Sequence, residues 1–188
     1  MPAATDTRYW TPDDVWALPD DGNRYECIDG VLLVTPSPQP PHQFVLGALS
    51  PRLYAYVRAE RLGRVLTSPA DLRLESSNVV QPDLFVVAQA PGAAVMRVWR
   101  EVTSLLLAVE VLSPSTARYD RGLKRRYYQR ANVAEYWIVD SEARLIERWR
   151  RGEQRPEVVA DVLTWHPEGA AAAMELDVAA LFEEALGA

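Results

Sequence analysis

Three charged side chains in the middle of this sequence have the types and spacing that metal-dependent hydrolysis needs. Asp83 follows Pro82 and stands at the start of the apolar segment LFVV. Glu110 lies within the apolar run LLLAVEVLSPST, where a carboxylate is costly unless it is paired or bound to a metal. Two such carboxylates can hold Mg²⁺, which prefers oxygen ligands and lowers the pKa of a bound water. With a basic residue close behind, this layout is typical of a metal-dependent phosphodiesterase.

Lys124 is that basic residue, and it is the single lysine among 20 basic residues. A lysine near the bound water can position it and stabilise developing charge, because its ammonium is compact and its pKa can shift. Arginine stays protonated and presents a wide planar fork instead. The excess of arginine over lysine is also what a composition bias would give, so the ratio alone assigns no role.

The segment from Arg118 to Arg130 carries six basic residues against one acid, in a chain whose net charge is −6. On a helix, Arg118, Arg121 and Arg125 share one face through steps of three and four residues. The functional interpretation is a ridge that contacts the phosphates of a nucleic acid. The structural interpretation is a solvated basic surface that balances nearby carboxylates.

The acidic candidates have structural interpretations too. Asp83 could cap the entry to its strand, and Glu110 could be ion-paired to an arginine. Glu26, in RYECIDG, lies in a strand that we expect to be half buried, where it would join an acidic site or form an edge-strand ion pair. His42 follows two prolines and could cap or line the start of a helix, and we expect a structural role for it.

The composition excludes several classes of protein. The 188 residues predict one domain spanning 1–188, with the 48% apolar and 24% charged residues of an ordinary globular chain. One cysteine, Cys27, and two histidines exclude a disulfide framework, a cysteine-rich zinc module and a multi-histidine metal site. The start of the chain carries acids and no apolar core, and no run approaches the ~18 apolar residues of a membrane helix. We therefore expect a cytoplasmic protein without membrane contact.

The order of the predicted elements indicates an α/β fold in which helices flank a mixed central sheet, with extra hairpins. A short helix capped by Thr11 precedes a hairpin that turns at Asp29-Gly30. After a loop over 35–41, a helix over 42–62 is expected to kink or break at Pro51. The remaining predicted elements are strands over 71–74, 83–87, 105–112, 135–140 and 143–151, a strand returning over 157–162, and helices over 118–131 and from Asp177 to 186.

The combined motifs give the chain a family resemblance. It resembles the Uma-two family, a bacterial group within the PD-(D/E)XK, or restriction-endonuclease-like, nuclease superfamily. The matching segments run in order from about residue 24 to 140: RYECIDGVLLV, PPHQFV, QPDLFVV, AVEVLSPST, the trio Arg118, Asp120 and Lys124, and AEYWIVD.

The resemblance implies a restriction-endonuclease-like fold and a set of site residues. Asp83 and Glu110 would be ligands of Mg²⁺ or Mn²⁺, joined by the backbone carbonyl of Val111. Glu26 would complete the acidic cluster. The superfamily pattern places a lysine two residues after the glutamate, but Leu112 stands there. In the family that lysine is thought to have moved to the following helix, which here carries Lys124.

Together these observations predict a metal-dependent endonuclease that hydrolyses nucleic-acid phosphodiester bonds, with DNA favoured on superfamily grounds and a homodimer expected. Asp83 and Glu110 hold the metal, Lys124 orients the attacking water, and Glu26 supports the site. One alternative is an inactive module that keeps the nuclease fold and binds nucleic acid or protein. Another is a metal-dependent hydrolase that acts on a smaller phosphodiester.

Overall fold

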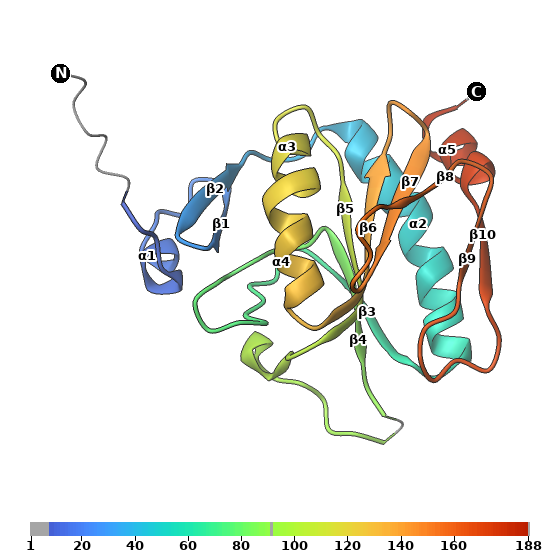
Figure 1. The fold of residues 1–188 in the computed structure, drawn as a ribbon, viewed down its shortest axis with the longest axis horizontal. Coiled ribbons are helices and arrows are strands. Elements are labelled where there is room, and N and C mark those ends of the chain that lie inside the picture. The colour runs from blue at the N-terminus through green and yellow to red at the C-terminus, as the bar shows by residue number, and fades with distance from the viewer. Residues whose placement is uncertain (1–7, 91, 188) are drawn as a thin grey trace.

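A computed structural model describes residues 8–90 and 92–187, and its centre is a six-stranded sheet (Figure 1). The strand order is β3-β4-β5-β6-β7-β8. Strands β5 and β6 pair in parallel, and every other pair of neighbours is antiparallel. The six strands are β3 (Gly63–Thr67), β4 (Leu84–Ala88), β5 (Leu105–Val111), β6 (Val133–Asp140), β7 (Leu145–Arg150) and β8 (Glu157–Val159).

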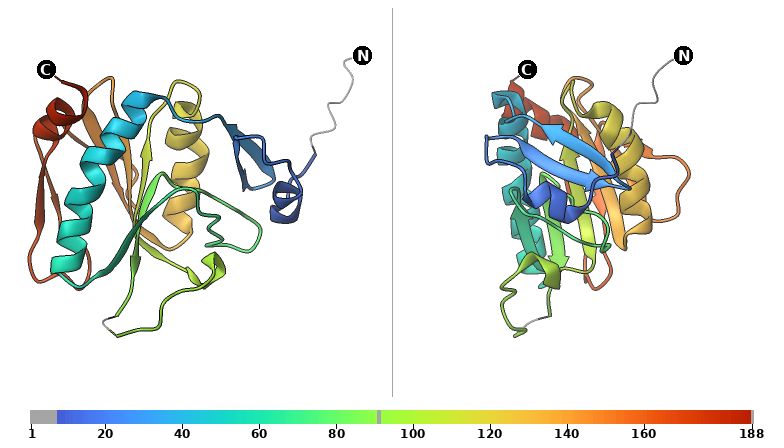
Figure 2. Two further views of the ribbon diagram at one scale, coloured as in Figure 1. Left: turned by 180° about the vertical axis from the view of Figure 1, so that it is seen from behind. Right: turned by 90° about the vertical axis from the view of Figure 1, so that its left-hand side faces the viewer.

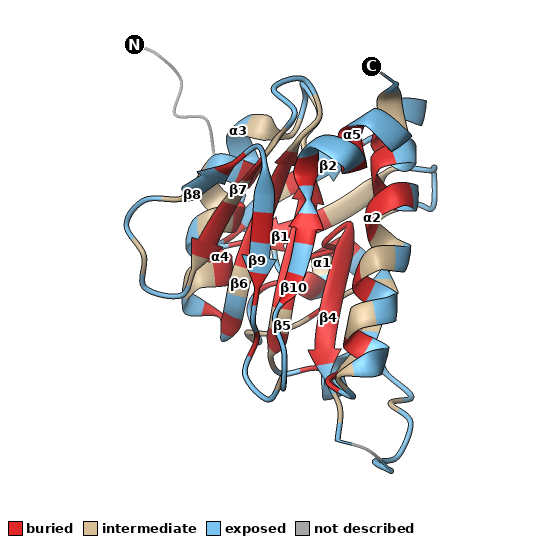
Figure 3. Cartoon of the chain, turned by 90° about the vertical axis from the view of Figure 1, so that its right-hand side faces the viewer, coloured by how far each residue is buried: buried red, intermediate tan, exposed pale blue. Residues whose placement is uncertain are grey.

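Helices cover both faces of this sheet (Figures 1 and 2). One face packs against α2 (Pro40–Ala59), α5 (Val178–Leu186) and the hairpin of β9 (Val162–Trp165) and β10 (Met174–Asp177). The other face packs against a helical segment made of α3 (Ala117–Tyr119), a π-helical turn over Asp120–Lys124 and α4 (Arg125–Arg130). The central strands β4, β5 and β6 are therefore buried on both sides, as their near-continuous apolar sequences require, whereas the edge strands β3 and β8 are partly exposed (Figure 3).

The N-terminal part of the chain forms a separate hairpin beside the sheet. Strands β1 (Arg24–Ile28) and β2 (Val31–Thr35) pair around a turn in which Asp29 and Gly30 have positive φ angles of 52° and 78°. The Cys27 and Val79 backbones exchange two hydrogen bonds, which tie β1 to the loop before β4. Helix α1 (Pro12–Trp16) begins at Thr11 with the predicted cap.

Helix α2 does not break at Pro51, so that alternative of the prediction is wrong. The helix begins two residues earlier than expected and runs through the proline to Ala59. Pro51 lies on the exposed side, while Val45, Leu49 and Leu53 pack into the core. This packing holds the helix together across the one backbone hydrogen bond that proline cannot donate.

The sequence-based prediction missed three strands and placed one strand where the structure has a loop. β3, β9 and β10 were not anticipated. The segment 71–74 is a loop in which Leu72 forms an isolated bridge with Val80. The fold class itself is confirmed: a mixed central sheet, flanking helices and extra hairpins. In the part of the chain that the structure describes, no helix is long and apolar enough to cross a membrane.

Candidate active site

The antiparallel pairing of β4 and β5 brings Asp83 and Glu110 together at one end of the sheet. Leu84 pairs with Val109, so the residue before β4 lies beside the end of β5. The backbone N–H of Val111 donates a hydrogen bond to Asp83 Oδ2 at 2.9 Å. Both carboxylates are almost completely buried, with 3% of each side chain exposed. Two residues that are 27 positions apart in sequence thus share one site.

Lys124 reaches the same site from the helical segment on the other face. Its ammonium lies 2.7 Å from Glu26 Oε2 and 2.9 Å from Glu110 Oε1. The hydroxyl of Tyr128, one helical turn further, donates to Glu110 Oε1 at 3.1 Å. Glu26 also accepts a hydrogen bond from the backbone N–H of Gln81 at 2.8 Å. The structure therefore brings Glu26, Asp83, Glu110 and Lys124 into one buried cluster.

A π-helical turn over Asp120–Lys124 carries this lysine. Such turns are rare, occur as single insertions in α-helices and are frequent at functional sites. Asp120 lies within the turn, is buried, and places Oδ1 3.9 Å from the Lys124 ammonium. The helical spacing of the sequence predicts a helix here but not its wider turn, so Asp120 was not recognised as a neighbour of the site.

Two further residues, Arg24 and His42, hold the Asp83 carboxylate. Arg24 Nη1 donates to Asp83 Oδ1 at 2.7 Å, and His42 Nε2 lies 3.0 Å from Asp83 Oδ2. The expected structural role of His42 therefore understates its position, because the ring contacts a predicted metal ligand. The sequence could have pointed to Arg24, because it lies two residues before Glu26 and residues two apart in a strand face the same side.

Burial and neighbouring charges set the protonation of the cluster. Burial alone would raise the pKa of Asp83, but the His42 hydrogen bond and the Arg24 charge lower it to about 2. Burial raises the pKa of Glu110 well above its usual range; Lys124 opposes this, and the charges of Asp83, Asp120 and Glu26 reinforce it. Burial would lower the pKa of Lys124, but the negative charges of Glu110, Glu26 and Asp120 raise it. Lys124 is thus held as an ammonium.

The donor set of this cluster fits a divalent cation. If the four buried carboxylates, on Glu26, Asp83, Glu110 and Asp120, were all ionised, they would outnumber the positive charges of Arg24 and Lys124 by two; burial and this crowding keep the pKa of Glu110 high while no cation is bound. Carboxylate oxygens are the ligands that Mg²⁺ and Mn²⁺ prefer. Within residues 8–90 and 92–187, no group of three His, Cys, Asp or Glu side chains is already arranged around a metal position. A bound ion would therefore depend on two side chains, a backbone oxygen and water.

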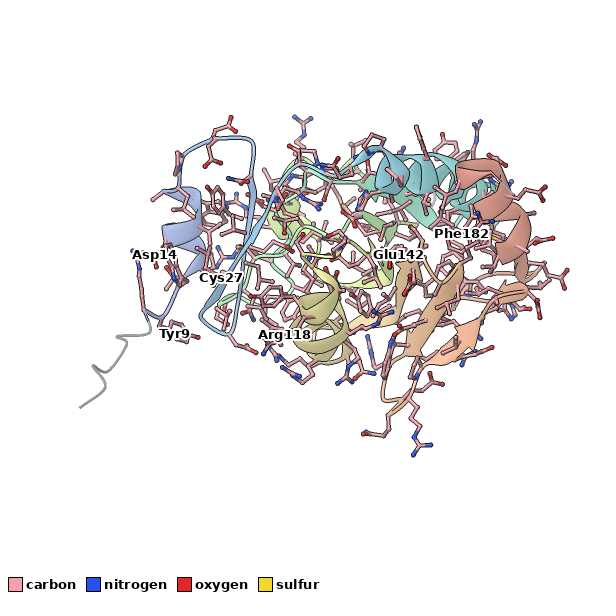
Figure 4. The ribbon with its side chains drawn as sticks, turned by 90° about the horizontal axis from the view of Figure 1, so that it is seen from above. Tyr9, Asp14, Cys27, Arg118, Glu142 and Phe182 are labelled. Atoms are coloured by element: carbon pink, nitrogen blue, oxygen red, sulfur yellow. The ribbon has the colours of Figure 1, made fainter. Side chains whose placement is uncertain are left out.

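A cleft of about 600 Å³ opens onto the cluster and gives a substrate access. Asp83, Glu110 and Lys124 lie on its wall. Its rim comes from the loop before α2, the loop after β5 and the turn between β6 and β7, which carries Glu142 (Figure 4). Prolines and hydroxyl side chains dominate this rim: Pro36, Ser37, Pro38, Pro41, Ser113, Pro114, Ser115 and Thr116.

The three arginines predicted to contact phosphates lie outside this cleft. Arg118 is exposed at the start of the helical segment (Figure 4). Arg121 is held by ion pairs of 2.7 Å to Asp140 and to Glu147. The Arg125 guanidinium lies 4.7 Å from the centre of the Trp149 ring. The structural interpretation of a basic surface that balances carboxylates therefore describes Arg121, and the role of all three in binding stays a prediction.

The fold and this cluster define a class: the chain has the fold of the restriction-endonuclease-like nucleases. A solved structure, described as a putative nuclease belonging to DUF820 from Anabaena variabilis, superposes with a TM-score of 0.75 and 19% sequence identity, over 94% of this chain and 99% of that one. The family model Uma2, described as "Putative restriction endonuclease", matches residues 12–179. This chain therefore belongs to the Uma2 family. A comparison with curated proteins gave no match.

Proposed function

We propose that this protein is a metal-dependent endonuclease that hydrolyses phosphodiester bonds of nucleic acid, with DNA as the favoured substrate. The observation that carries the proposal is the position of Lys124, whose buried ammonium joins Glu26 and Glu110 beside Asp83 on the wall of one cleft. Membership of a restriction-endonuclease-like family supports the same reaction.

Asp83 and Glu110 would hold Mg²⁺ or Mn²⁺ together with the backbone carbonyl of Val111. Such a metal polarises a phosphate oxygen and lowers the pKa of a bound water. Arg24 and His42 fix the Asp83 carboxylate through one contact on each oxygen. Residues that hold a ligand in one orientation raise its effectiveness, because little reorganisation is then needed when the metal binds.

Lys124 acts as a charged hydrogen-bond donor and not as a base. Its ammonium keeps its proton because Glu26 and Glu110 accept from it at 2.7 and 2.9 Å. From this position it can orient a water for attack and stabilise the negative charge that develops on the phosphate. Glu26 supports the site by holding Lys124, and the Gln81 N–H in turn holds Glu26.

One observation favours a second candidate, an inactive module that keeps the nuclease fold. Both oxygens of Asp83 and one oxygen of Glu110 already have protein partners. A cluster satisfied in this way could be purely structural. The cluster has four carboxylates but two basic side chains, and a metal ion would supply the missing counter-charge, which argues for the enzyme, since buried carboxylates without a counter-charge are costly.

The two candidates are separated by cleavage of closed circular substrates, which only an internal cut can open. Circular single-stranded DNA, relaxed circular duplex DNA and circular RNA are incubated with the protein and Mg²⁺ or Mn²⁺. We expect opening of at least one circle by the natural protein, none by Asp83→Asn, and natural activity in Asp161→Asn, a matched change at an exposed site. Equal cleavage by Asp83→Asn, or none by any form, would overturn the proposal.

A further inference from the structure

Two adjoining hollows follow helix α2 away from the active site. The first, of about 460 Å³, lies between α2 and the end of β3 and reaches Asp83, Arg24 and His42. The second, of about 590 Å³, lies between the C-terminal half of α2 and the start of β3. Because α2 runs along the length of the sheet (Figures 1 and 2), the second hollow lies at the far end of the helix from the cleft.

The two hollows share no lining residue but follow one another along α2 and β3, and we call the surface that carries them the α2–β3 groove. On α2 five lining residues follow one stripe of the helix, at steps of three or four residues: Gln43, Gly47, Ser50, Tyr54 and Arg58. Arg61 lines the second hollow just beyond the end of the helix. On β3 the hollows meet at consecutive residues, since Leu66 lines the second and Thr67 the first. The groove thus leads from Asp83 along the edge strand of the sheet.

Three arginines, Arg58, Arg61 and Arg64, line the far end of this groove. All three are exposed, and no carboxylate of the described residues lies within ion-pair distance of them. The intervening Glu60 forms no ion pair with them; its carboxylate instead accepts hydrogen bonds from the backbone N–H groups of Ala171 and Ala172 at 2.6 and 3.2 Å. Arg121, by contrast, is neutralised by two carboxylates.

We propose that the α2–β3 groove is the path of a single, unpaired strand of nucleic acid whose phosphates are held by Arg58, Arg61 and Arg64. This inference rests on the proposed nuclease function and names the form of its substrate. Three guanidinium groups without a carboxylate partner among the described residues complement a phosphate backbone; Arg64 donates one hydrogen bond, of 2.9 Å, to the side-chain oxygen of Gln89 and keeps its charge. Tyr54, 53% exposed beside them, offers a ring on which a base can stack.

The dimensions of the groove favour a single strand over a duplex. Each hollow has the volume of a small-ligand pocket, which a duplex cannot enter. Arg58 follows His42 by 16 residues, which is about 24 Å along a helix. At a rise of about 3.4 Å per nucleotide this distance corresponds to about seven nucleotides, and to fewer in an extended strand. A strand of that length would reach from the carboxylates to the arginines.

The experiment measures the binding of labelled oligonucleotides in the absence of metal by fluorescence anisotropy. The salt concentration is varied from about 50 to about 200 mM, where phosphate contacts change the affinity strongly. The full chain is compared with the triple variant Arg58→Gln, Arg61→Gln, Arg64→Gln. A second triple variant, Arg126→Gln, Arg151→Gln, Arg155→Gln, makes the same charge change at exposed sites on α4 and on the turn before β8. Ligands are 20-nucleotide single strands of DNA and RNA, a matching duplex, and a 3-nucleotide strand. Thermal unfolding verifies that each variant is folded.

For the natural protein we expect tighter binding of at least one 20-nucleotide single strand than of the duplex. The groove variant should bind that strand about a hundredfold more weakly at 0.1 M salt, and its slope of log K against log salt should fall by about 2, because each contact with a single-stranded phosphate contributes about 0.7. The 3-nucleotide strand can contact the arginines but cannot also reach the cleft, so the natural protein should bind it more weakly than the 20-nucleotide strand. The control variant should bind like the natural protein.

Equal losses in the two triple variants, or unchanged binding in the groove variant, would overturn the inference. Duplex binding as tight as single-strand binding would overturn the single-strand assignment. These outcomes are independent of the proposed function, because binding is measured without metal and without cleavage. If the natural protein opens no circle but the groove variant loses binding, the nuclease proposal is refuted and the groove proposal is retained.

Discussion

Lys124 occupies a position that serves both the packing of the fold and the proposed reaction. It is 96% buried, since 4% of its side chain is exposed, and its contacts to Glu26 and Glu110 join the hairpin to the sheet. The sequence singled it out because it is the one lysine among many arginines. The structure adds the reason that arginine is unsuitable: a larger, planar head group does not fit where two carboxylates converge on a point charge.

Lys124→Arg keeps the charge but should lower cleavage by roughly a hundredfold, the effect of losing a well-placed electrostatic donor. The extra volume should also cost about 1–3 kcal/mol of stability. Cleavage rates under saturating Mn²⁺ and denaturant unfolding measure the two effects separately. Arg126→Lys, the reverse change at an exposed site, should alter neither. Natural activity in Lys124→Arg would show that the ammonium has no special role.

Asp120 is a buried acid that should weaken the fold at neutral pH. Burial raises the pKa of Asp120 to about 6, although Lys124 opposes the rise, and Oδ1 has no hydrogen-bond partner among the described residues. Because the folded state binds the proton more tightly than the unfolded chain, stability falls as pH rises towards 6 and stays reduced above it. Asp120→Asn should therefore stabilise the metal-free protein by roughly 2–3 kcal/mol at pH 8.

That advantage should shrink below pH 6 and vanish below the ordinary pKa of an aspartate, near 3.8. Urea unfolding of both forms at several pH values measures it directly. A less stable Asn variant at pH 8 would mean that the 3.9 Å contact with Lys124 stabilises the folded state more than burial of the charge destabilises it.

At the scale of elements, the hairpin β1–β2 carries two site residues, Arg24 and Glu26, yet it is not part of the central sheet. A two-stranded hairpin has little stability of its own, so its turn and its packing must hold it. The turn was recognisable in the sequence as Asp29-Gly30, and it has the positive φ angles that such a turn demands.

Gly30→Ala should therefore destabilise the protein by about 1–2 kcal/mol, because φ is +78° at this position and a side chain there is strained. Gly30→Asn should cost less, since asparagine tolerates the left-handed region. Denaturant unfolding of the two variants compares them. Equal losses would indicate that contact with the Tyr9 ring, and not the backbone angle, decides the cost.

How much of the site was predictable depends on how each residue reaches it. Asp83, Glu110, Lys124 and Glu26 were identified because unusual charges interrupt apolar or repetitive patterns. Arg24, His42 and Asp120 were not, because their contacts depend on the docking of the hairpin, the entry to α2 and a π-helical turn. β3 was missed for a similar reason: GRVLT is short, and its pairing with β4 is set by tertiary packing.

At the scale of the whole molecule, some arginines form internal ion pairs, and three without such a pair lie together at one end of the groove. Arg121 and Arg148 neutralise carboxylates, while Arg58, Arg61 and Arg64 do not. A chain with net charge −6 can thus present a local basic path. The negative net charge of the whole chain excludes only nucleic-acid binding that depends on overall positive charge.

The resemblance to a superfamily that often acts as dimers predicts two copies in solution. From the sequence, the aromatic-rich strands around Trp137 and Trp149 could bury against a partner, but the structure buries both tryptophans within the chain, with 0% and 8% exposed. A dimer would have to use another surface. Light scattering coupled to size-exclusion chromatography should give twice 21.1 kDa, and a mass of 21.1 kDa would refute the dimer.

The central claim, that Asp83 and Glu110 bind a catalytic metal, is tested most directly by calorimetric titration of the protein with Mn²⁺. We predict a saturable site in the natural protein that Asp83→Asn abolishes, while Asp161→Asn binds normally. Saturation at about 100 times Kd should also stabilise the fold by about 2.7 kcal/mol, which raises the Tm by several degrees. The same binding heat from the natural protein and from Asp83→Asn, or no heat from either, would contradict the account.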